Sequence, residues 1–171
     1  ADTHGGAPLS CEPVLDGLRR HARAAPERIA FTFVREDGRE ESLSAGELLA
    51  RAERGAAALA ARAAPGERAL LLYPPGLPFV VAFFACLRAG LAAVSAPLPR
   101  RAEGDVRLRA LLEDAAPSLV LAPRDVLAGL GRSLRPDTAT LLALEDGDGR
   151  VALPLPPWPG ADDLAFIQYT S

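Results

Sequence analysis

Short apolar segments alternate with helical patterns through the middle of the chain. Residues 68–73 form an apolar run of strand length, which a proline-proline-glycine turn ends. Residues 79–87 are apolar on all sides, which predicts a buried helix, and Gly90 suits the left-handed position that follows a helix. Residues 91–96 again have strand length. This strand-helix-strand unit predicts two neighbouring parallel strands joined by a right-handed crossover.

The same alternation continues toward the carboxyl terminus. Asp105 can cap a helix whose apolar positions extend to Ala115, and residues 119–122 form another apolar strand. A short helix then leads to a strand at residues 138–144. Because parallel strands are buried on both faces, helices are expected on both sides of the sheet. The pattern predicts an α/β fold with a mainly parallel, doubly wound sheet flanked by helices.

A helix and a β-hairpin are predicted before this unit. Apolar positions between Val14 and Ala25 fall on one helical face. Residues 29–34 and 39–43 have the pattern of two hairpin arms around an Asp-Gly turn. The charge on the second arm indicates an exposed strand edge rather than an acidic binding patch.

A capping pattern marks the start of the next helix. The Ser44 side chain can accept a hydrogen bond from the Glu47 amide, while the Glu47 carboxylate reaches back to the Ser44 amide. Leu43 and Leu48 can form the hydrophobic staple around this capping box. The helix should continue to Ala63 and cover one side of the sheet.

Composition limits the function classes. The chain has 171 residues, 24% of them charged, and a net charge of -3, which makes no electrostatic case for nucleic acid or an anionic membrane. The apolar helix is too short to span a bilayer, which takes about 20 residues. Cys11 and Cys86 are far apart in the sequence, and Cys86 lies inside the apolar helix, so a structural disulfide between them is not expected. Unpaired cysteines favour a location in the reducing cytoplasm.

The basic residues carry a further restriction. All 19 of them are arginine, and the chain contains no lysine. This excludes Schiff-base chemistry and the Walker P-loop, both of which need a lysine. The chain also lacks methionine, so its first residue is not expected to be a translation start.

Two groups of residues are candidate site residues. His21 lies beside the apolar stripe of the first helix, and a surface or hydrogen-bonded histidine is favoured because no nucleophile motif accompanies it. Arg100 and Arg101 follow a parallel strand, where they could meet an anion, although an exposed loop explains them equally well. The sequence pattern gives no evidence that the loop with Arg100 and Arg101 lies near the end of the chain.

Residues 145–160 interrupt the alternation and are interpreted as a linker. An acidic, glycine-containing stretch is followed by four prolines around Trp158, which predicts a stiff, extended connector. The acidic residues lack the glutamate and the loop length of an EF-hand. No metal site is predicted among them.

The last residues carry a resemblance to a known family. Residues 163–169 lead into Thr170 and Ser171, and this ending resembles the strand and first residues of the phosphate-binding signature of adenylate-forming enzymes, which continues Y-T-S-G-[ST]-T-G. The hairpin with its capped helix, the turn at 73–79, the helix that follows it and the loop at 97–101 resemble the first subdomain of fatty acyl-AMP ligases. Gln168 before Tyr-Thr-Ser resembles that branch more than ordinary acyl-CoA synthetases.

The resemblance implies both an activity and a place in a larger protein. A fatty acid carboxylate would attack the α-phosphate of Mg²⁺-bound ATP, and the acyl group would then pass to the phosphopantetheine of an acyl carrier protein. Thr170 and Ser171 would contact the ATP phosphates, or they are simply the last ordered residues. Residues 1–171 would be the N-terminal part of the adenylation domain, ending at the start of the phosphate-binding loop. The rest of that domain and a C-terminal domain with its catalytic lysine would be required, so residues 1–171 alone are expected to be inactive.

Three hypotheses stay open at this point. The chain is part of a fatty acyl-AMP ligase, part of an acyl-CoA synthetase or peptide-synthetase adenylation domain, or a non-catalytic module of the same ancestry. An insertion that restrains a mobile C-terminal domain would favour the first hypothesis, a coenzyme A channel the second, and a disrupted phosphate loop the third.

Overall fold

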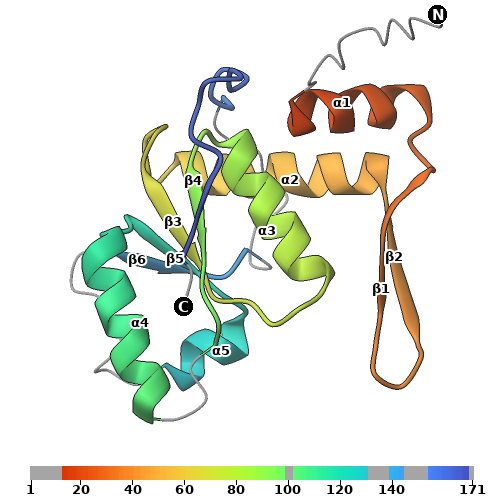
Figure 1. Cartoon of the computed structure of the whole chain (residues 1–171). Helices are drawn as coiled ribbons and strands as arrows, with labels where there is room; N and C mark the ends of the chain where they lie inside the picture. The colour runs from red at the N-terminus through yellow and green to blue at the C-terminus, as the bar shows by residue number, and fades with distance from the viewer. Residues whose placement is uncertain (1–12, 99–101, 131–138, 145–153, 170–171) are drawn as a thin grey trace, which may run out of the picture.

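A parallel sheet of five strands organises the molecule (Figure 1). The computed structural model describes residues 13–98, 102–130, 139–144 and 154–169. The strand order is β6-β5-β3-β4-β7, and all four pairings are parallel. The strands are β3 (Arg68–Leu71), β4 (Ala92–Ser95), β5 (Leu119–Leu121), β6 (Thr140–Leu142) and β7 (Phe166–Gln168). The predicted parallel sheet is confirmed.

Helices cover both faces of this sheet because both faces are apolar. Ala69 and Leu71 of β3 pack with α2 (Ala45–Ala60) and α3 (Leu77–Arg88). Leu70 and Leu72 point to the opposite face and pack with α4 (Ala102–Ala115) and α5 (Arg124–Gly129). The period of two along β3 thus divides the core into two layers. This arrangement is the doubly wound fold that the sequence predicts.

The helix at the centre of the predicted unit is buried as expected. Phe84 is 6% exposed, and Phe83 is partly buried and packs against the same core. Gly90 follows α3 with φ of 72°, the left-handed conformation that glycine adopts without strain. Within the described residues, no helix combines the length and the apolar character needed to cross a membrane.

The capping box at the start of α2 is confirmed in both directions. The Glu47 amide donates to Ser44 Oγ at 3.2 Å, and the Ser44 amide donates to Glu47 Oε2 at 3.1 Å. The hydrogen bond from the Ser44 amide is the main cause that lowers the pKa of Glu47, because it favours the carboxylate. Leu43 and Leu48 are both buried in one cluster, as expected for the hydrophobic staple.

The hairpin β1 (Ile29–Val34) and β2 (Glu40–Ser44) forms a separate antiparallel sheet. Figure 1 shows it projecting away from the five-stranded sheet. Its turn contains Gly38 with φ of 81°, as the Asp-Gly pattern predicts. Ile29 and Val34 are more than half exposed, so the apolar arm of the hairpin is less buried than its composition implies.

Two local expectations are wrong. Helix α4 begins at Ala102, so Asp105 lies inside the first turn and does not precede the helix as its cap. In α1 (Val14–Ala24), Leu15 and Leu18 are buried, but Val14 is 56% exposed because it lies at the first turn, outside the packed stripe. Both errors concern helix starts, where apolar periodicity alone gives no sharp boundary.

We predict that Gly55→Ala destabilises the chain by about 1–2 kcal/mol, although alanine is the better helix former. A Cβ at Gly55 would lie 2.7 Å from the Cβ of Ala85, at the contact between α2 and α3. Urea denaturation should show a lower midpoint, and Ala85→Gly should recover part of the loss in the double variant.

Gly129→Ala is the matched control, since a Cβ at Gly129 meets nothing within 4 Å. It should leave the midpoint unchanged or raise it slightly. A Gly55→Ala variant as stable as the parent chain would show that α2 and α3 are less tightly packed than described.

Candidate functional site

The carboxyl ends of the parallel strands form one edge of the five-stranded sheet. The chain leaves β3 for α3 on one face of the sheet, and it leaves β5 for α5 on the opposite face. The strand order therefore reverses between these two neighbours. Ligands of open α/β sheets bind outside the carboxyl ends, at such reversals. This edge is where the fold itself favours a ligand site.

The predicted phosphate-contacting residues follow the last strand at this edge. Thr170 and Ser171 lie outside the described residues and come directly after Tyr169. Strand β7 pairs in parallel with β4, and Gln168 lies opposite Ser95. The last described residue, Tyr169, therefore follows β7 at the carboxyl edge of the sheet.

Side chains on both faces hold β7 against the molecule. The ring of Phe166 contacts that of Phe83 on α3, with 6.1 Å between centroids. Ile167 points to the other face and packs with the cluster beneath α4 and α5. Phe166 nevertheless stays 52% exposed, because β7 lies at the edge of the described sheet.

Tyr169 links the end of β7 to helix α4. Its hydroxyl donates to Asp114 Oδ2 at 2.5 Å. This hydrogen bond raises the pKa of Tyr169, because only the protonated phenol can donate, and desolvation and the charge of Asp114 act in the same direction. The residue before Thr170 is thus fixed by a tertiary contact.

In the structure β4 and β7 are neighbours, although nothing in the sequence pattern predicts their pairing. Arg100 and Arg101 lie outside the described residues, but their loop follows Leu98 and leaves β4. Since β4 and β7 are adjacent, this loop and the one that begins at Thr170 leave adjacent strands at the same edge. Sequence reasoning missed the pairing of β4 with β7 because the paired residues lie far apart in the chain.

Other reactive side chains do not form a site among the described residues. Cys86 is a free, fully buried thiol, and burial raises its pKa to about 12, so it stays protonated and unreactive at neutral pH. His21 lies half-buried on α1. No group of three or more metal-ligating side chains occurs in the described part of the chain.

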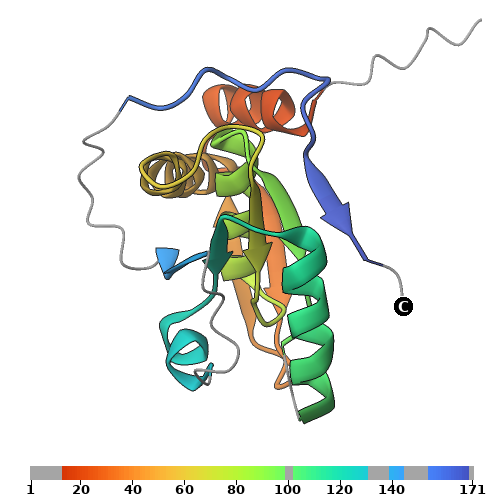
Figure 2. The ribbon, with the colours of Figure 1, turned by 90° about the vertical axis from the view of Figure 1, so that its left-hand side faces the viewer.

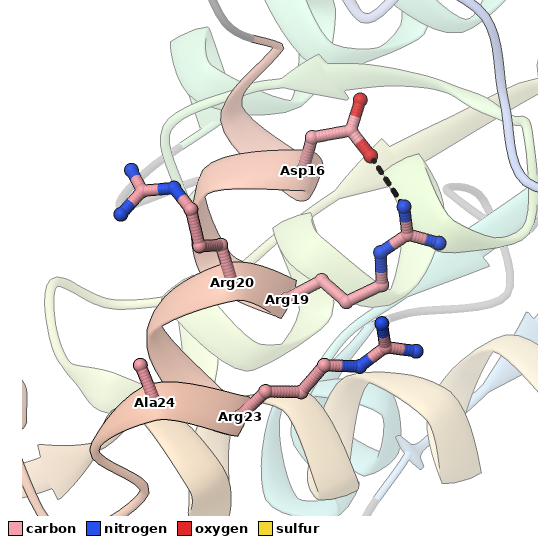
Figure 3. Close-up of a pocket in the computed structure, with 5 residues that line it drawn as sticks. All are labelled: Asp16, Arg19, Arg20, Arg23 and Ala24. Carbon is pink, nitrogen blue, oxygen red and sulfur yellow. Dashed lines mark ion pairs between the residues drawn. The ribbon is translucent and has the colours of Figure 1, made fainter.

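A surface hollow of about 700 Å³ lies elsewhere, along α1 (Figure 3). Arg19 and Arg23 point to the same side of the helix, whereas Arg20 points to the other. Asp16 forms an ion pair with Arg19 at 3.3 Å. The arginines do not converge on one point, so the hollow offers no single place where all three could bind one anion.

Comparison with protein families finds a match over most of the chain. A family model described as AMP-binding enzyme matches residues 18–171. The match begins within α1 and includes every strand of the five-stranded sheet.

Individual relatives agree with this match. A 4-hydroxyphenylalkanoate adenylyltransferase of Mycobacterium marinum is 33% identical over 95% of this chain and 28% of its own length. The long-chain-fatty-acid–AMP ligase FadD26 of the same species is 30% identical over 96% of this chain and 30% of its own length. A crystal structure of the fatty acyl-adenylate ligase of L. pneumophila, in complex with acyl adenylate and pyrophosphate, superposes with a TM-score of 0.82 and 32% identity, over 95% of this chain and 29% of that chain. This chain therefore spans less than a third of the length of these proteins.

We predict that Asp114→Asn lowers the titration midpoint of Tyr169 toward the ordinary tyrosine pKa of about 10. The substitution removes the carboxylate that favours the protonated phenol. Carbon NMR of labelled tyrosine rings, with Tyr169→Phe to assign the signal, measures the midpoint.

The hydrogen bond between Tyr169 and Asp114 also sets how the stability of the chain changes with pH. Because the folded-state pKa of Tyr169 is raised, its contribution to stability is complete below pH 10 and is lost as the pH rises through the folded-state pKa. An unchanged midpoint in Asp114→Asn would show that the contact does not exist in solution.

Proposed function

The chain belongs to the AMP-binding enzyme family, and on this basis we propose that it is the N-terminal part of the adenylation domain of a ligase that activates a fatty acid with ATP. The observation that carries the proposal is the family match over residues 18–171, and it is supported by the parallel strand β7, whose carboxyl end comes shortly before Thr170 in the sequence. The named relatives supply the reaction class, since each forms or binds an adenylate.

The proposed first step joins the acid to AMP. A carboxylate oxygen attacks the α-phosphorus, the bond to the β-phosphate oxygen breaks, and acyl-adenylate and pyrophosphate result. The negative charge that develops on the phosphate oxygens has to be stabilised by hydrogen-bond donors held in place beforehand. Hydroxyl groups and backbone amides of Thr170 and Ser171 would supply the first of these donors, and Mg²⁺ bound to ATP would neutralise further charge.

The proposed second step transfers the acyl group to the phosphopantetheine thiol of an acyl carrier protein. The thiol attacks the acyl carbon, and AMP leaves. Free coenzyme A is the alternative acceptor, and its use would make the protein an acyl-CoA synthetase. The resemblance of Gln168 and of the loop at 97–101 to fatty acyl-AMP ligases favours the carrier protein. We place the protein in the cytoplasm, which the unpaired thiol of Cys86 supports.

We predict that residues 1–171 alone do not exchange labelled pyrophosphate into ATP in the presence of a fatty acid. The chain holds two residues of the phosphate loop, contains no lysine, and spans less than a third of its relatives' length. The full-length protein should catalyse this exchange, dependent on the acid. Exchange by residues 1–171 would contradict the proposed division of the reaction between domains.

The full-length protein should also prefer fatty acids in this assay. A 4-hydroxyphenylalkanoate is the informative competitor, since one relative is named for that substrate class. A larger kcat/KM for the aromatic acid would mean that the protein adenylates an aromatic acid and that the proposed fatty acid substrate is wrong.

We predict that thioester formation in the full-length protein depends on a phosphopantetheinylated carrier protein. Mass spectrometry of the carrier measures the transfer, and the same carrier without phosphopantetheine is the control. Efficient acyl-CoA formation with no carrier present would assign the protein to the acyl-CoA synthetases.

A further inference from the structure

Arg88 is a buried cation at the end of α3, and its side chain has an unusual environment. It is 6% exposed, although burial of a charged group is unfavourable and lowers its pKa. Glu53 acts on it only through longer-range charge, and no ion pair of Arg88 occurs among the described residues. A surface position at the helix end would have sufficed for interaction with the helix dipole. The burial of Arg88 therefore calls for another explanation.

The contacts of Arg88 are made with residues 154–160, called the strap below. Its Nη1 donates to the carbonyl oxygen of Pro156 at 2.9 Å. Its guanidinium lies 4.6 Å from the ring centroid of Trp158, and the guanidinium of Arg19 on α1 lies at the same distance from that ring. Trp158 also packs against the cluster shared by α1, α2 and α3. Two arginines from different helices thus hold the single tryptophan of the strap.

These contacts leave polar atoms unsatisfied. Among the described residues, Arg88 Nε and Trp158 Nε1 are buried without a hydrogen-bond partner. Buried donors without a partner are uncommon in native structures, and each one calls for an explanation. Local departures of this kind are expected where a residue has a task besides stability.

Residues 161–165 connect the strap to β7. Figure 2 shows the strap passing across α1 before the chain turns down into the strand. The turn is closed by the Gly160 amide, which donates to Asp163 Oδ2 at 2.8 Å. Strand β7 follows within a few residues, and Tyr169 and Thr170 come directly after it.

Strand β7 needs an external constraint on its register. It has three residues and pairs with β4 on one side within the described sheet. A strand of three residues has few ladder hydrogen bonds and few side chains to hold its register, and a slip of one residue moves the chain by about 3.3 Å and exchanges the faces of all side chains. Such a slip would displace Thr170 by more than a hydrogen bond tolerates.

We propose that Arg88, Arg19 and Trp158 are positioning residues, which anchor the strap and thereby fix the register of β7, the strand that precedes the proposed ATP phosphate-binding loop. The part concerning ATP rests on the proposed function. The stiff strap, with prolines on both sides of Trp158, transmits the position of the indole to the strand. None of the three residues touches the reacting atoms.

Hydrogen exchange of the 171-residue chain tests the anchor without any activity. In Trp158→Ala the amides of residues 166–168 should exchange at least tenfold faster, relative to those of residues 119–121, because two cation–π contacts and the packed indole are lost. Trp158→Phe should restore part of the protection.

Arg19→Ala provides a variant that keeps the core intact, because its side chain is 39% exposed. It should accelerate exchange of residues 166–168 about twofold to fivefold, since one cation–π contact is lost. Arg23→Ala, one turn along the same face of α1, is the matched control and should change nothing.

The full-length protein tests the consequence for the reaction. Trp158→Ala and Arg19→Ala should lower kcat for pyrophosphate exchange at saturating ATP and leave KM for the fatty acid unchanged. Arg23→Ala, which leaves Trp158 and its two arginine contacts in place, should leave kcat at its parent value at a temperature where all variants are folded.

Three results would overturn the proposal. The first is unchanged protection of residues 166–168 in Trp158→Ala, and the second is equal loss of protection at residues 119–121, which would indicate a general structural role. The third is an unchanged kcat in variants whose β7 exchanges faster. Absence of pyrophosphate exchange in the parent protein with any acid would instead refute the proposed function, and hydrogen exchange would still decide whether the anchor exists.

Discussion

Burial of both faces of β3 is the constraint on which the other elements depend. Its alternate residues enter two separate clusters, and Leu70 and Leu71 are fully buried on opposite sides. A strand without solvent on either face must pair its backbone on both edges and carry helices on both faces. Neighbours β4 and β5 satisfy the first requirement, and α2 to α5 satisfy the second. All carboxyl ends then meet at one edge, which gives the candidate site its place.

Features with local causes could be predicted from the sequence. The capping box of Ser44 and Glu47 depends on residues three apart, and the burial of α3 follows from a helix that is apolar on every side. The parallel strands were predictable for the same reason, because their apolar runs are separated by helices. Thr170 and Ser171 were identified through a resemblance, and their own geometry lies outside the described residues.

Contacts between distant segments could not be predicted in this way. The pairing of β4 with β7 and the bond from Arg88 to Pro156, which spans 68 positions, have no local signature. An arginine in the last turn of a helix is favourable because it interacts with the helix dipole. Because this local explanation is sufficient, the sequence gives no sign that Arg88 also makes a tertiary contact. The one available signal was a single tryptophan in a proline-rich stretch, where stiffness suggests a spacer and not an anchor.

The central claim is that the sheet and its anchored strap deliver Thr170 and Ser171 to the phosphates of ATP. A crystal structure of the full-length protein with acyl-adenylate and pyrophosphate tests it most directly. We expect donor atoms of Thr170 or Ser171 about 3 Å from a phosphate oxygen, with β7 in the register described and Trp158 between Arg19 and Arg88. Phosphates bound away from the carboxyl edge of the five-stranded sheet, with Thr170 and Ser171 making no contact to them, would contradict it.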